Sequence, residues 1–330
     1  MSDGGEKKVK KGITQVFKIF DRLSRPQKQF LSTLSGLLLL ALVFTVLSPY
    51  FFSVNNILTV ATQTAVIAII AIGQTYVLIT GGIDLSIGSN MALAGMVAGL
   101  CMRANLPVPA AIIAGLLTGT CAGAVSGTLV AFGKLPPFIA TLGTMTVARG
   151  LAFILTQAIP IANLPGKFTI FGTGRTFGIP NPVIIMVMLF LVFGFILGKT
   201  RLGRHVYATG SNFEAARLSG VNTRRVLMTV YVFSGLLAAF AGLIMAARVV
   251  TAQPGAGDGY ELDAVASSVI GGTSTMGGEG AIAGTFIGAF VIGVLRNGLN
   301  LVGVTPHLQR VIIGIVIVGS VFLDKIKKRD

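Results

Sequence analysis

Apolar residues are gathered into ten stretches that are separated by short polar or glycine-containing segments. The stretches cover residues 31–48, 57–79, 87–102, 108–131, 137–157, 181–198, 226–248, 261–275, 280–299 and 307–323. Because a bilayer core needs about 20 apolar residues per helix, stretches of this kind predict transmembrane helices. The eighth begins with Glu261 and Asp263 and ends in glycines, which indicates a short or broken helix. We expect an all-α polytopic membrane protein with about ten transmembrane helices.

Composition supports this pattern. Hydrophobic residues make up 53% of the chain, charged residues only 11%, and the mean hydropathy is +0.84. Soluble domains carry roughly 25% charged residues. We expect one transmembrane domain over residues 31–323, between a basic cytoplasmic N-terminal segment (1–30) and a basic cytoplasmic tail (324–330). The length leaves no room for a large additional soluble domain.

The net charge of +15 is concentrated, because 18 of the 26 Lys and Arg residues lie in segments 1–30, 199–225 and 325–330. Cations beside hydrophobic spans mark the cytoplasmic side of a membrane. Ten crossings place all three segments on that side, whereas nine would place the basic tail outside. Loops 158–180 and 250–260 are then external. A nucleic-acid-binding surface is the competing explanation of the charge, but its clustering beside spans argues against that class.

Neither an enzyme motif nor a metal motif is evident. Cys101 and Cys121 lie in apolar stretches, which argues against a disulfide framework, and no metal-ligand cluster is present. The nearest approach to a phosphate-binding loop, at residues 194–200, has three residues between its glycines where a Walker A loop has four, and it ends an apolar helix. We expect no catalytic residue, cofactor or metal here, so any ATP must be bound by a partner.

Asp84, in the sequence GGIDLSIGS, is the only acid between Asp21 and Glu214. A charge at the membrane centre costs about 2.5–3.5 kcal/mol on insertion scales, so acids found there tend to be functional. Asp84 also lies between two predicted helices, and an Asp followed two residues later by Ser can cap the next helix. The sequence leaves open both a structural cap and a place on a polar pathway.

Arg149 lies inside the fifth predicted helix, so its side chain must face protein or water. A salt bridge to another helix and the lining of a polar pathway both stay open. Other polar residues in or beside the spans are Gln63, Gln74, Asn90, Arg296 and Asn297. Each alone is typical of a helix contact. Together they could line a route for a neutral polar solute, which needs hydrogen-bond donors and acceptors without fixed charge of one sign.

Glycines mark helix contacts. Gly115, Gly119, Gly123 and Gly127 form one face of the fourth predicted helix. Such a face allows close helix packing, and glycine-based flexibility is the alternative explanation. A weak internal repeat is also present, because VLITGGIDLSIGS from Val77 and SSVIGGTSTMGGE from Ser267 both place Gly-Gly and hydroxyl residues between two hydrophobic segments.

The basic loop 199–225 is long enough to hold its own short helix. Ser211 or Asn212 can cap that helix, Glu214 suits its first turn and Gly220 ends it. One explanation is a solvated loop that only orients the protein. A capped helix with exposed Phe213 and Leu218 indicates instead a docking surface.

Four segments carry a resemblance to a known family: GGIDLSIGS (81–89), LPPFIATLGTMTVARG (135–150), ATGSNFEAARLSGVNTRR (208–225) and SSVIGGTSTMGGEG (267–280). The chain resembles the permease subunits of bacterial ATP-binding-cassette importers of the ribose-type monosaccharide group. The resemblance covers nearly all of the chain after about residue 30.

The resemblance implies a permease in the bacterial inner membrane, in contact with lipid and paired with a second copy. Each copy docks a cytoplasmic ATPase subunit, which binds ATP and Mg²⁺, and a periplasmic binding protein delivers the sugar; no nucleic acid is involved. Residues expected in ATPase coupling are Asn212, Glu214, Ala215, Ala216, Arg217 and Gly220. Residues expected on the translocation path or in gating are Gln63, Gln74, Asp84, Asn90, Arg149 and Asn297.

Other functions stay open. The same permease type serves further small solutes, such as a furanose quorum signal or nucleosides. An ion-coupled secondary transporter would need several acids within its spans, and a membrane scaffold would carry no solute. The sequence does not identify the sugar.

Overall fold

The computed structural model describes residues 25–327. Most of the predicted N-terminal segment 1–30 and the last residues of the predicted tail 324–330 therefore lie outside the described residues. The helices are α2 (Arg25–Leu47), α3 (Val54–Ile79), α4 (Ile87–Arg103), α5 (Val108–Ala131), α6 (Pro137–Ile154), α7 (Gly166–Thr173), α8 (Asn181–Lys199), α9 (Arg201–Ser211), α10 (Phe213–Leu218), α11 (Thr223–Val249), α12 (Tyr260–Ile270), α13 (Ile282–Leu301) and α14 (Pro306–Lys327). The strands are β1 (Ile161–Ala162), β2 (Arg175–Thr176), β3 (Ile179–Pro180) and β4 (Thr251–Ala252).

Each predicted apolar stretch coincides with a helix. Seven helices in the described part of the chain are long and apolar enough to cross a membrane: α2, α3, α5, α6, α8, α11 and α13. α4 has 17 residues and α12 only 11. The eighth stretch is therefore short, as expected, but its helix ends at Ile270 rather than at residue 275. The protein is a predominantly helical, polytopic membrane protein.

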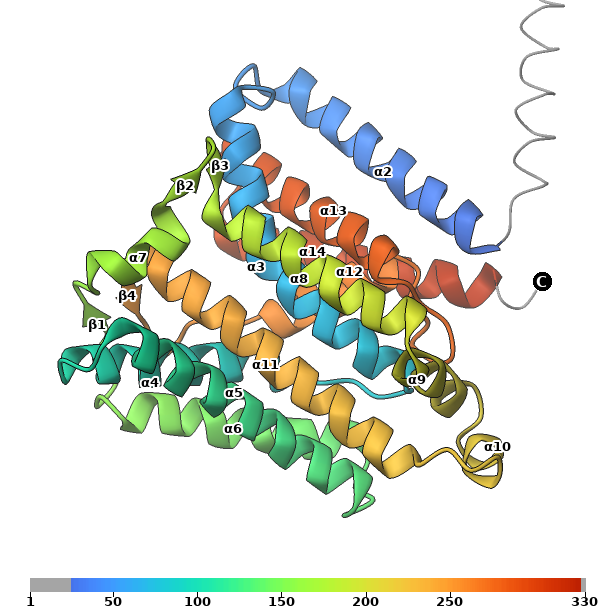
Figure 1. Ribbon diagram of the computed structural model, residues 1–330. Coiled ribbons are helices and arrows are strands. Elements are labelled where there is room, and N and C mark those ends of the chain that lie inside the picture. Colours follow the sequence, from blue (N-terminus) through green and yellow to red (C-terminus); the bar gives the residue numbers. More distant parts are fainter. Residues whose placement is uncertain (1–24, 328–330) are drawn as a thin grey trace, which may run out of the picture.

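The long helices run side by side in one bundle (Figure 1). α9 and α10 lie at one end, which we call the α10 end, and α7 with the four strands lies at the other, the β4 end. The first residue of α2 and the last of α14 both lie at the α10 end. This arrangement agrees with the prediction that segment 199–225 and both ends of the apolar domain share one side.

Two helices form the centre of the bundle. Every residue of α3 from Thr64 to Ile79 is buried, and most of α11 is buried as well. A helix that is apolar on all sides belongs in the interior of a bundle. The outer helices expose large apolar side chains, such as Leu38 and Leu39 of α2 and Leu191 of α8. An apolar outer surface of this kind suits acyl chains as its solvent.

The predicted glycine face of α5 packs against α11. A Cβ added at Gly119 would meet the Gly235 carbonyl at 2.6 Å and the Ala239 side chain at 2.7 Å. A Cβ at Gly123 would collide with the Tyr231 carbonyl. The backbones therefore approach too closely for any larger side chain, and the packing interpretation of the glycine face is confirmed.

Two non-helical segments interrupt the bundle, one between α3 and α4 (80–86) and one between α12 and α13 (271–281). They contain the two halves of the internal repeat. The segments meet: a Cβ on Gly277 would lie only 3.1 Å from the Gly81 nitrogen, and the Gly278 N–H donates to the carbonyl of Ile79, the last residue of α3, at 2.8 Å. The similarity of the two sequences thus corresponds to a contact at the α10 end.

The loops hold more structure than the sequence indicated. Segment 199–225 contains two helices, α9 and α10, rather than one. The loop 158–180 contains α7 and three strands. β1 pairs with β4 in antiparallel register, Ile161 opposite Ala252, so the loops 158–180 and 250–260 are joined at the β4 end. This agrees with the expectation that both lie on one side.

We expect Gly123→Val to destabilise the bundle by about 1–3 kcal/mol, because the new side chain has no space between α5 and α11. The midpoint of thermal unfolding in detergent should fall. Gly194→Val in α8 is the matched control, since a Cβ there meets nothing within 4 Å. Equal midpoints for the two variants would contradict the packing assignment.

Candidate functional site

Asp84 is fully buried just before α4, where it accepts three hydrogen bonds. Its Oδ1 accepts from the Ser86 backbone N–H at 2.9 Å and from the Ser86 hydroxyl at 2.6 Å. Its Oδ2 accepts from the hydroxyl of Ser234, near the middle of α11, at 2.7 Å. None of the ion pairs among residues 25–327 involves Asp84. These three donors therefore hold the carboxyl group in the protein interior without a neighbouring cation.

Two glycines determine the path of the backbone before Asp84. Gly81 has φ +80°, which residues with a side chain rarely adopt. A Cβ on Gly82 would lie only 2.6 Å from the Tyr231 hydroxyl. The bond to the Ser86 N–H then satisfies a backbone donor at the start of α4. Asp84 therefore has a structural role: one oxygen binds Ser86, the residue that precedes α4, and the other ties this segment to α11, although no side chain caps α4 itself.

Several buried polar atoms beside this segment have no hydrogen-bond partner. The Asn90 side-chain N–H donates to the Ser86 hydroxyl at 3.2 Å, while the Asn90 Oδ1 is unpaired. Both amide atoms of Gln74 in α3 are unpaired, although Gln74 is fully buried. The hydroxyls of Ser89 and Ser267 also have no hydrogen-bond partner. Such groups cost about 1–3 kcal/mol each when nothing pairs them, so in a folded protein they bind water, a ligand or a partner in another state.

Arg149 forms no salt bridge among the described residues, so that explanation is not supported. Its guanidinium donates to the carbonyls of Pro254 at 3.2 Å and Ala256 at 2.7 Å. The loop 250–260 therefore runs inward from β4, and Gly257 packs against Gly88 in the first turn of α4. Arg149 thus fixes the irregular backbone that connects α11 to α12.

Gln63 and Asn297 lie elsewhere. Gln63 lines a cavity of about 410 Å³ between α3, α7 and the end of α11. Asn297 exchanges two hydrogen bonds of 3.0 Å with Asn56 and so joins α13 to α3. Of the six predicted pathway residues, the structure links only Asp84 and Asn90 in one hydrogen-bonded cluster, through Ser86.

An ion pair joins the short α12 to α13. Asp263 is buried, and its carboxylate lies 2.6 Å from the Arg296 guanidinium, which also lies over the ring of Tyr260. Both residues are visible in the sequence, but nothing in the sequence indicates that Asp263 and Arg296 form an ion pair. The contact neutralises two charges inside the bundle.

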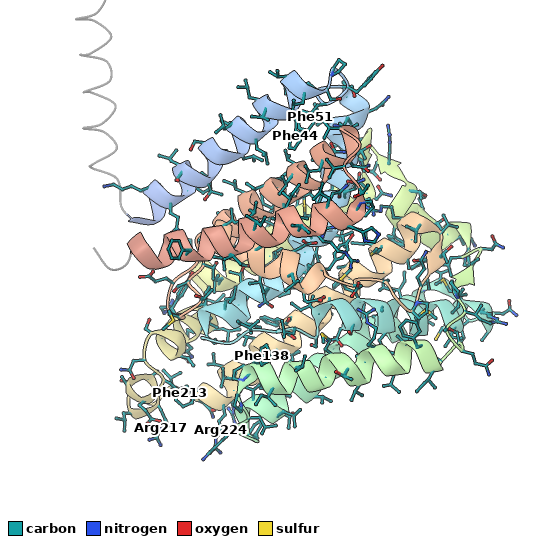
Figure 2. The ribbon with its side chains drawn as sticks, turned by 180° about the vertical axis from the view of Figure 1, so that it is seen from behind. Phe44, Phe51, Phe138, Phe213, Arg217 and Arg224 are labelled. Atoms are coloured by element: carbon teal, nitrogen blue, oxygen red, sulfur yellow. The ribbon has the colours of Figure 1, made fainter. Side chains whose placement is uncertain are left out.

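The short helix predicted in loop 199–225 is α10. The Asn212 side chain caps it by accepting from the Ala215 N–H at 2.9 Å. Arg217 and Glu214 form an ion pair of 2.7 Å, Ala216 faces inward, and Gly220 follows the helix with φ +85°. Ala215 is exposed, and so are the apolar Phe213 (41%) and Leu218 (79%). Figure 2 shows Phe213 and Arg217 at the outermost tip of the α10 end.

α9 connects this tip to the interrupted segments. A Cβ on Gly210, two residues before Asn212, would collide with the Ile79 carbonyl and lie 2.8 Å from the Gly278 nitrogen. The Tyr207 hydroxyl donates to the Gly280 carbonyl at 2.7 Å. Burial raises the pKa of Tyr207, which keeps its hydroxyl a neutral donor. We call Ile79, Gly210 and Gly278 the glycine junction; it leads from α10 to both interrupted segments.

Sequence patterns missed Ser234 and the glycine junction. Ser234 is one hydroxyl in an apolar helix, and such a residue gives no signal of its own. The Gly-Gly repeat was visible, but nothing in it indicated that its copies touch or that α9 packs on both.

Comparisons with known proteins place this geometry in context. A family model described as the permease component of the branched-chain amino acid transport system matches residues 56–321. The chain is 45% identical to the ribose import permease protein of Escherichia coli strain K12, over 90% of this chain and 94% of the relative. It is 46% identical to that of Bacillus subtilis strain 168, over 91% and 94%. It is 39% identical to the D-allose transport system permease protein of Escherichia coli strain K12, over 88% and 90%. No solved structure matches.

We expect Arg149→Met to release the loop 250–260, because two hydrogen bonds from a charged donor are lost, each contributing about 1.5–3 kcal/mol. Hydrogen–deuterium exchange of a peptide covering this loop should accelerate about tenfold or more. Arg103→Met, at the exposed end of α4, removes the same charge and should leave the loop unchanged. Equal exchange in both variants would show that Arg149 does not hold the loop.

Proposed function

The chain belongs to this family of permease components, and we propose that it is the membrane-spanning subunit of an ATP-driven importer that carries a ribose-like monosaccharide into the cytoplasm. The observation that carries the proposal is the identity of 45% with a ribose import permease over 90% of the chain. An importer permease has no catalytic step of its own. ATP and Mg²⁺ belong to a separate ATPase subunit, and this chain holds neither a cofactor nor a metal.

The protein crosses the inner membrane ten times. Seven crossings are the long apolar helices. α4 and α12 contribute two more, each together with the interrupted segment beside it, and α14 contributes the last. An even number leaves both termini in the cytoplasm with the α10 end. The supporting observation is that the start of α2 and the end of α14 lie at that end (Figure 1), where Lys and Arg are concentrated.

The ATPase subunit docks on α10. The exposed Phe213 and Leu218 provide an apolar surface, and the cap by Asn212 with the Glu214–Arg217 pair keeps the helix formed. A periplasmic sugar-binding protein docks at the β4 end. A second copy of this chain completes the transport pathway within the lipid bilayer, and no nucleic acid takes part.

ATP binding on the partner moves α10, and α9 carries the motion to the glycine junction. Gly210 is in backbone contact with both interrupted segments, so a displacement of α9 acts on the α3–α4 and α12–α13 connections together. These connections are the non-helical parts of the bundle, which can adopt a second arrangement with little loss of helical hydrogen bonding. Coupling arises because the two arrangements differ in their contacts with α9.

The sugar passes a route lined by polar groups in and beside the first interrupted segment. Asp84, with Asn90 of α4 and Gln74 of α3, offers a carboxyl group and amides that suit hydroxyl groups. The unpaired amide atoms of Gln74 and the free Asn90 oxygen are stabilised when the second arrangement or a sugar hydroxyl pairs them. Arg149 holds the backbone of loop 250–260 and Asn297 joins α13 to α3, whereas Gln63 lines a separate cavity.

Two alternatives follow from particular observations. The identity with a D-allose permease favours another small polyol or sugar as the solute, within the same mechanism. An ion-coupled transporter needs an acid free to exchange a proton or cation. Asp84 is held by three donors and Asp263 by Arg296, which argues against that class.

Proteoliposomes containing this chain, its ATPase subunit and its binding protein should take up labelled D-ribose only when ATP is supplied. Uptake should persist in the presence of a protonophore and should be reduced by unlabelled D-allose less than by unlabelled D-ribose. Liposomes lacking the binding protein serve as the control. Uptake that survives ATP depletion but stops with the protonophore would instead identify an ion-coupled transporter.

The Gly210→Val variant should bind the ATPase subunit normally but transport sugar poorly. The new side chain cannot fit against Ile79 and Gly278, so we expect ATP-driven uptake to fall about tenfold or more. Co-elution with the ATPase subunit should be retained, because α10 is unchanged. Gly198→Val, where a Cβ meets nothing within 4 Å, is the matched control.

Normal uptake by the Gly210→Val variant would exclude the glycine junction from coupling. The docking assignment has its own test. If the chain fails to co-elute with the ATPase, and replacing Glu214 and Gly220 leaves uptake intact, α10 is not the coupling helix.

A further inference from the structure

A cavity of about 650 Å³ opens beside α10, between the α5–α6 connection and the first three turns of α11. Its wall is largely apolar and includes Val130, Leu135 and Leu227. Its inner end is formed by Gly82 and Tyr231. The cavity therefore extends from the α10 end toward the interrupted segment that carries Asp84. Neither the coupling helix nor the proposed sugar route accounts for a cavity in this place.

Positive charge surrounds the mouth of the cavity. Lys134 from the α5–α6 connection, Arg217 from α10 and Arg224 from α11 all line it. The only acid in the lining is Glu214, and it pairs with Arg217. Lys134 and Arg224 are exposed, and neither has an ion-pair partner among residues 25–327. The cavity thus has an excess of positive charge, which attracts an anion.

Tyr231 supplies a second, independent observation. Its side chain is fully buried, its hydroxyl lines the inner end of the cavity, and the hydroxyl has no hydrogen-bond partner. A buried hydroxyl of this kind is costly unless something pairs it. A ligand that fills the cavity would do so, because the hydroxyl can donate to an oxygen of that ligand.

The residues around the cavity indicate which kind of molecule carries the anionic group. Phe213 lines the mouth, and Phe132 and Phe138, which flank lining residues in the sequence, are exposed as well; exposed apolar rings of this kind suit contact with acyl chains. Figure 2 shows Phe138, Phe213, Arg217 and Arg224 gathered at this end of the bundle. A basic mouth, an apolar wall and an aromatic rim fit an amphipathic anion better than a free one.

We propose that this cavity binds the phosphate headgroup of an anionic phospholipid from the leaflet at the α10 end. Lys134 and Arg224 bind the phosphate, and the Tyr231 hydroxyl donates to an oxygen of the headgroup or glycerol. Basic pockets between helices on the cytoplasmic side are suited to such headgroups, because anionic lipids give that leaflet a negative surface potential. The assignment of the α10 end to the cytoplasmic leaflet rests on the proposed function, and the rest of this proposal does not.

The site would let lipid composition act on coupling. Glu214 and Arg217 belong both to α10 and to the cavity lining. A bound headgroup therefore restrains α10 through side chains of that helix, and the ATPase then meets a coupling helix that is already held in position.

The test is lipid retention by the purified full chain in mild detergent, measured by native mass spectrometry with equal amounts of phosphatidylglycerol and phosphatidylcholine. The wild type should retain phosphatidylglycerol preferentially. The double variant Lys134→Asn, Arg224→Gln should lower that retention about fivefold for each charge removed. Asn is chosen at position 134 because Lys134 has φ 55°, which Asn tolerates. Tyr231→Phe should weaken retention further without changing charge.

The matched control is Lys167→Gln, Arg175→Gln, which removes two exposed cations at the β4 end and should retain the lipid as the wild type does. Size-exclusion profiles confirm that each variant is folded. Equal retention of both lipids, or no effect of the Lys134, Arg224 variant, overturns the proposal. So does displacement of the lipid by glycerol phosphate at equal concentration, which would identify a site for free phosphate.

One more result would overturn the lipid assignment: variants that retain phosphatidylglycerol but lose co-elution with the ATPase, since the cavity would then bind an acidic protein surface. The measurement uses neither ATP nor sugar. A chain that imports no sugar can therefore still bind lipid, and a chain that imports sugar can fail to bind it.

Discussion

The hydrogen bond from the Gly278 N–H to the Ile79 carbonyl joins the two places where the helical bundle is interrupted. Inside a bilayer no water can pair backbone groups, so non-helical backbone persists there only when protein surrounds it. Segments 80–86 and 271–281 meet this constraint by contacting each other and α9, through Gly210 and the Tyr207 hydroxyl. The backbone atoms that make the interruptions possible also contact α9, which leads directly into α10.

Two kinds of packing divide the bundle. Between α5 and α11, glycines bring backbones into direct contact and leave nothing to rearrange. Around α4, hydroxyls, amides and the Asp84 carboxylate replace apolar contacts, and several of their atoms are unpaired. Dense packing resists deformation, whereas polar groups with incomplete pairing have other partners to find. A rigid half beside a polar, adjustable half is what alternating access to a sugar requires.

Sequence patterns predicted the helices closely, because a helix that crosses a bilayer must be long enough to span it and apolar along most of its length. The coupling helix was also predictable, since Asn212, Glu214 and Gly220 occupy positions set by local backbone chemistry. The role of Arg149 was not predictable: the sequence left open a salt bridge and a place on a polar pathway, and its partners are the carbonyls of Pro254 and Ala256. A hydrogen bond to a backbone carbonyl cannot be predicted from the pattern of side chains in the sequence. Asn297 likewise gave no sign that it pairs with Asn56 rather than facing a solute.

The sequence by itself determined an all-helical membrane protein, its basic side and a capped helix in loop 199–225, because hydrophobicity, charge and capping act over neighbouring residues. Only the tertiary structure decided that Asp84 bonds to Ser234, 150 positions away, and that the two Gly-Gly segments meet beneath α9. Those contacts follow from how helices cross. Crossing is set by the combined shape of many side chains and by close backbone approach, which no single stretch of sequence contains.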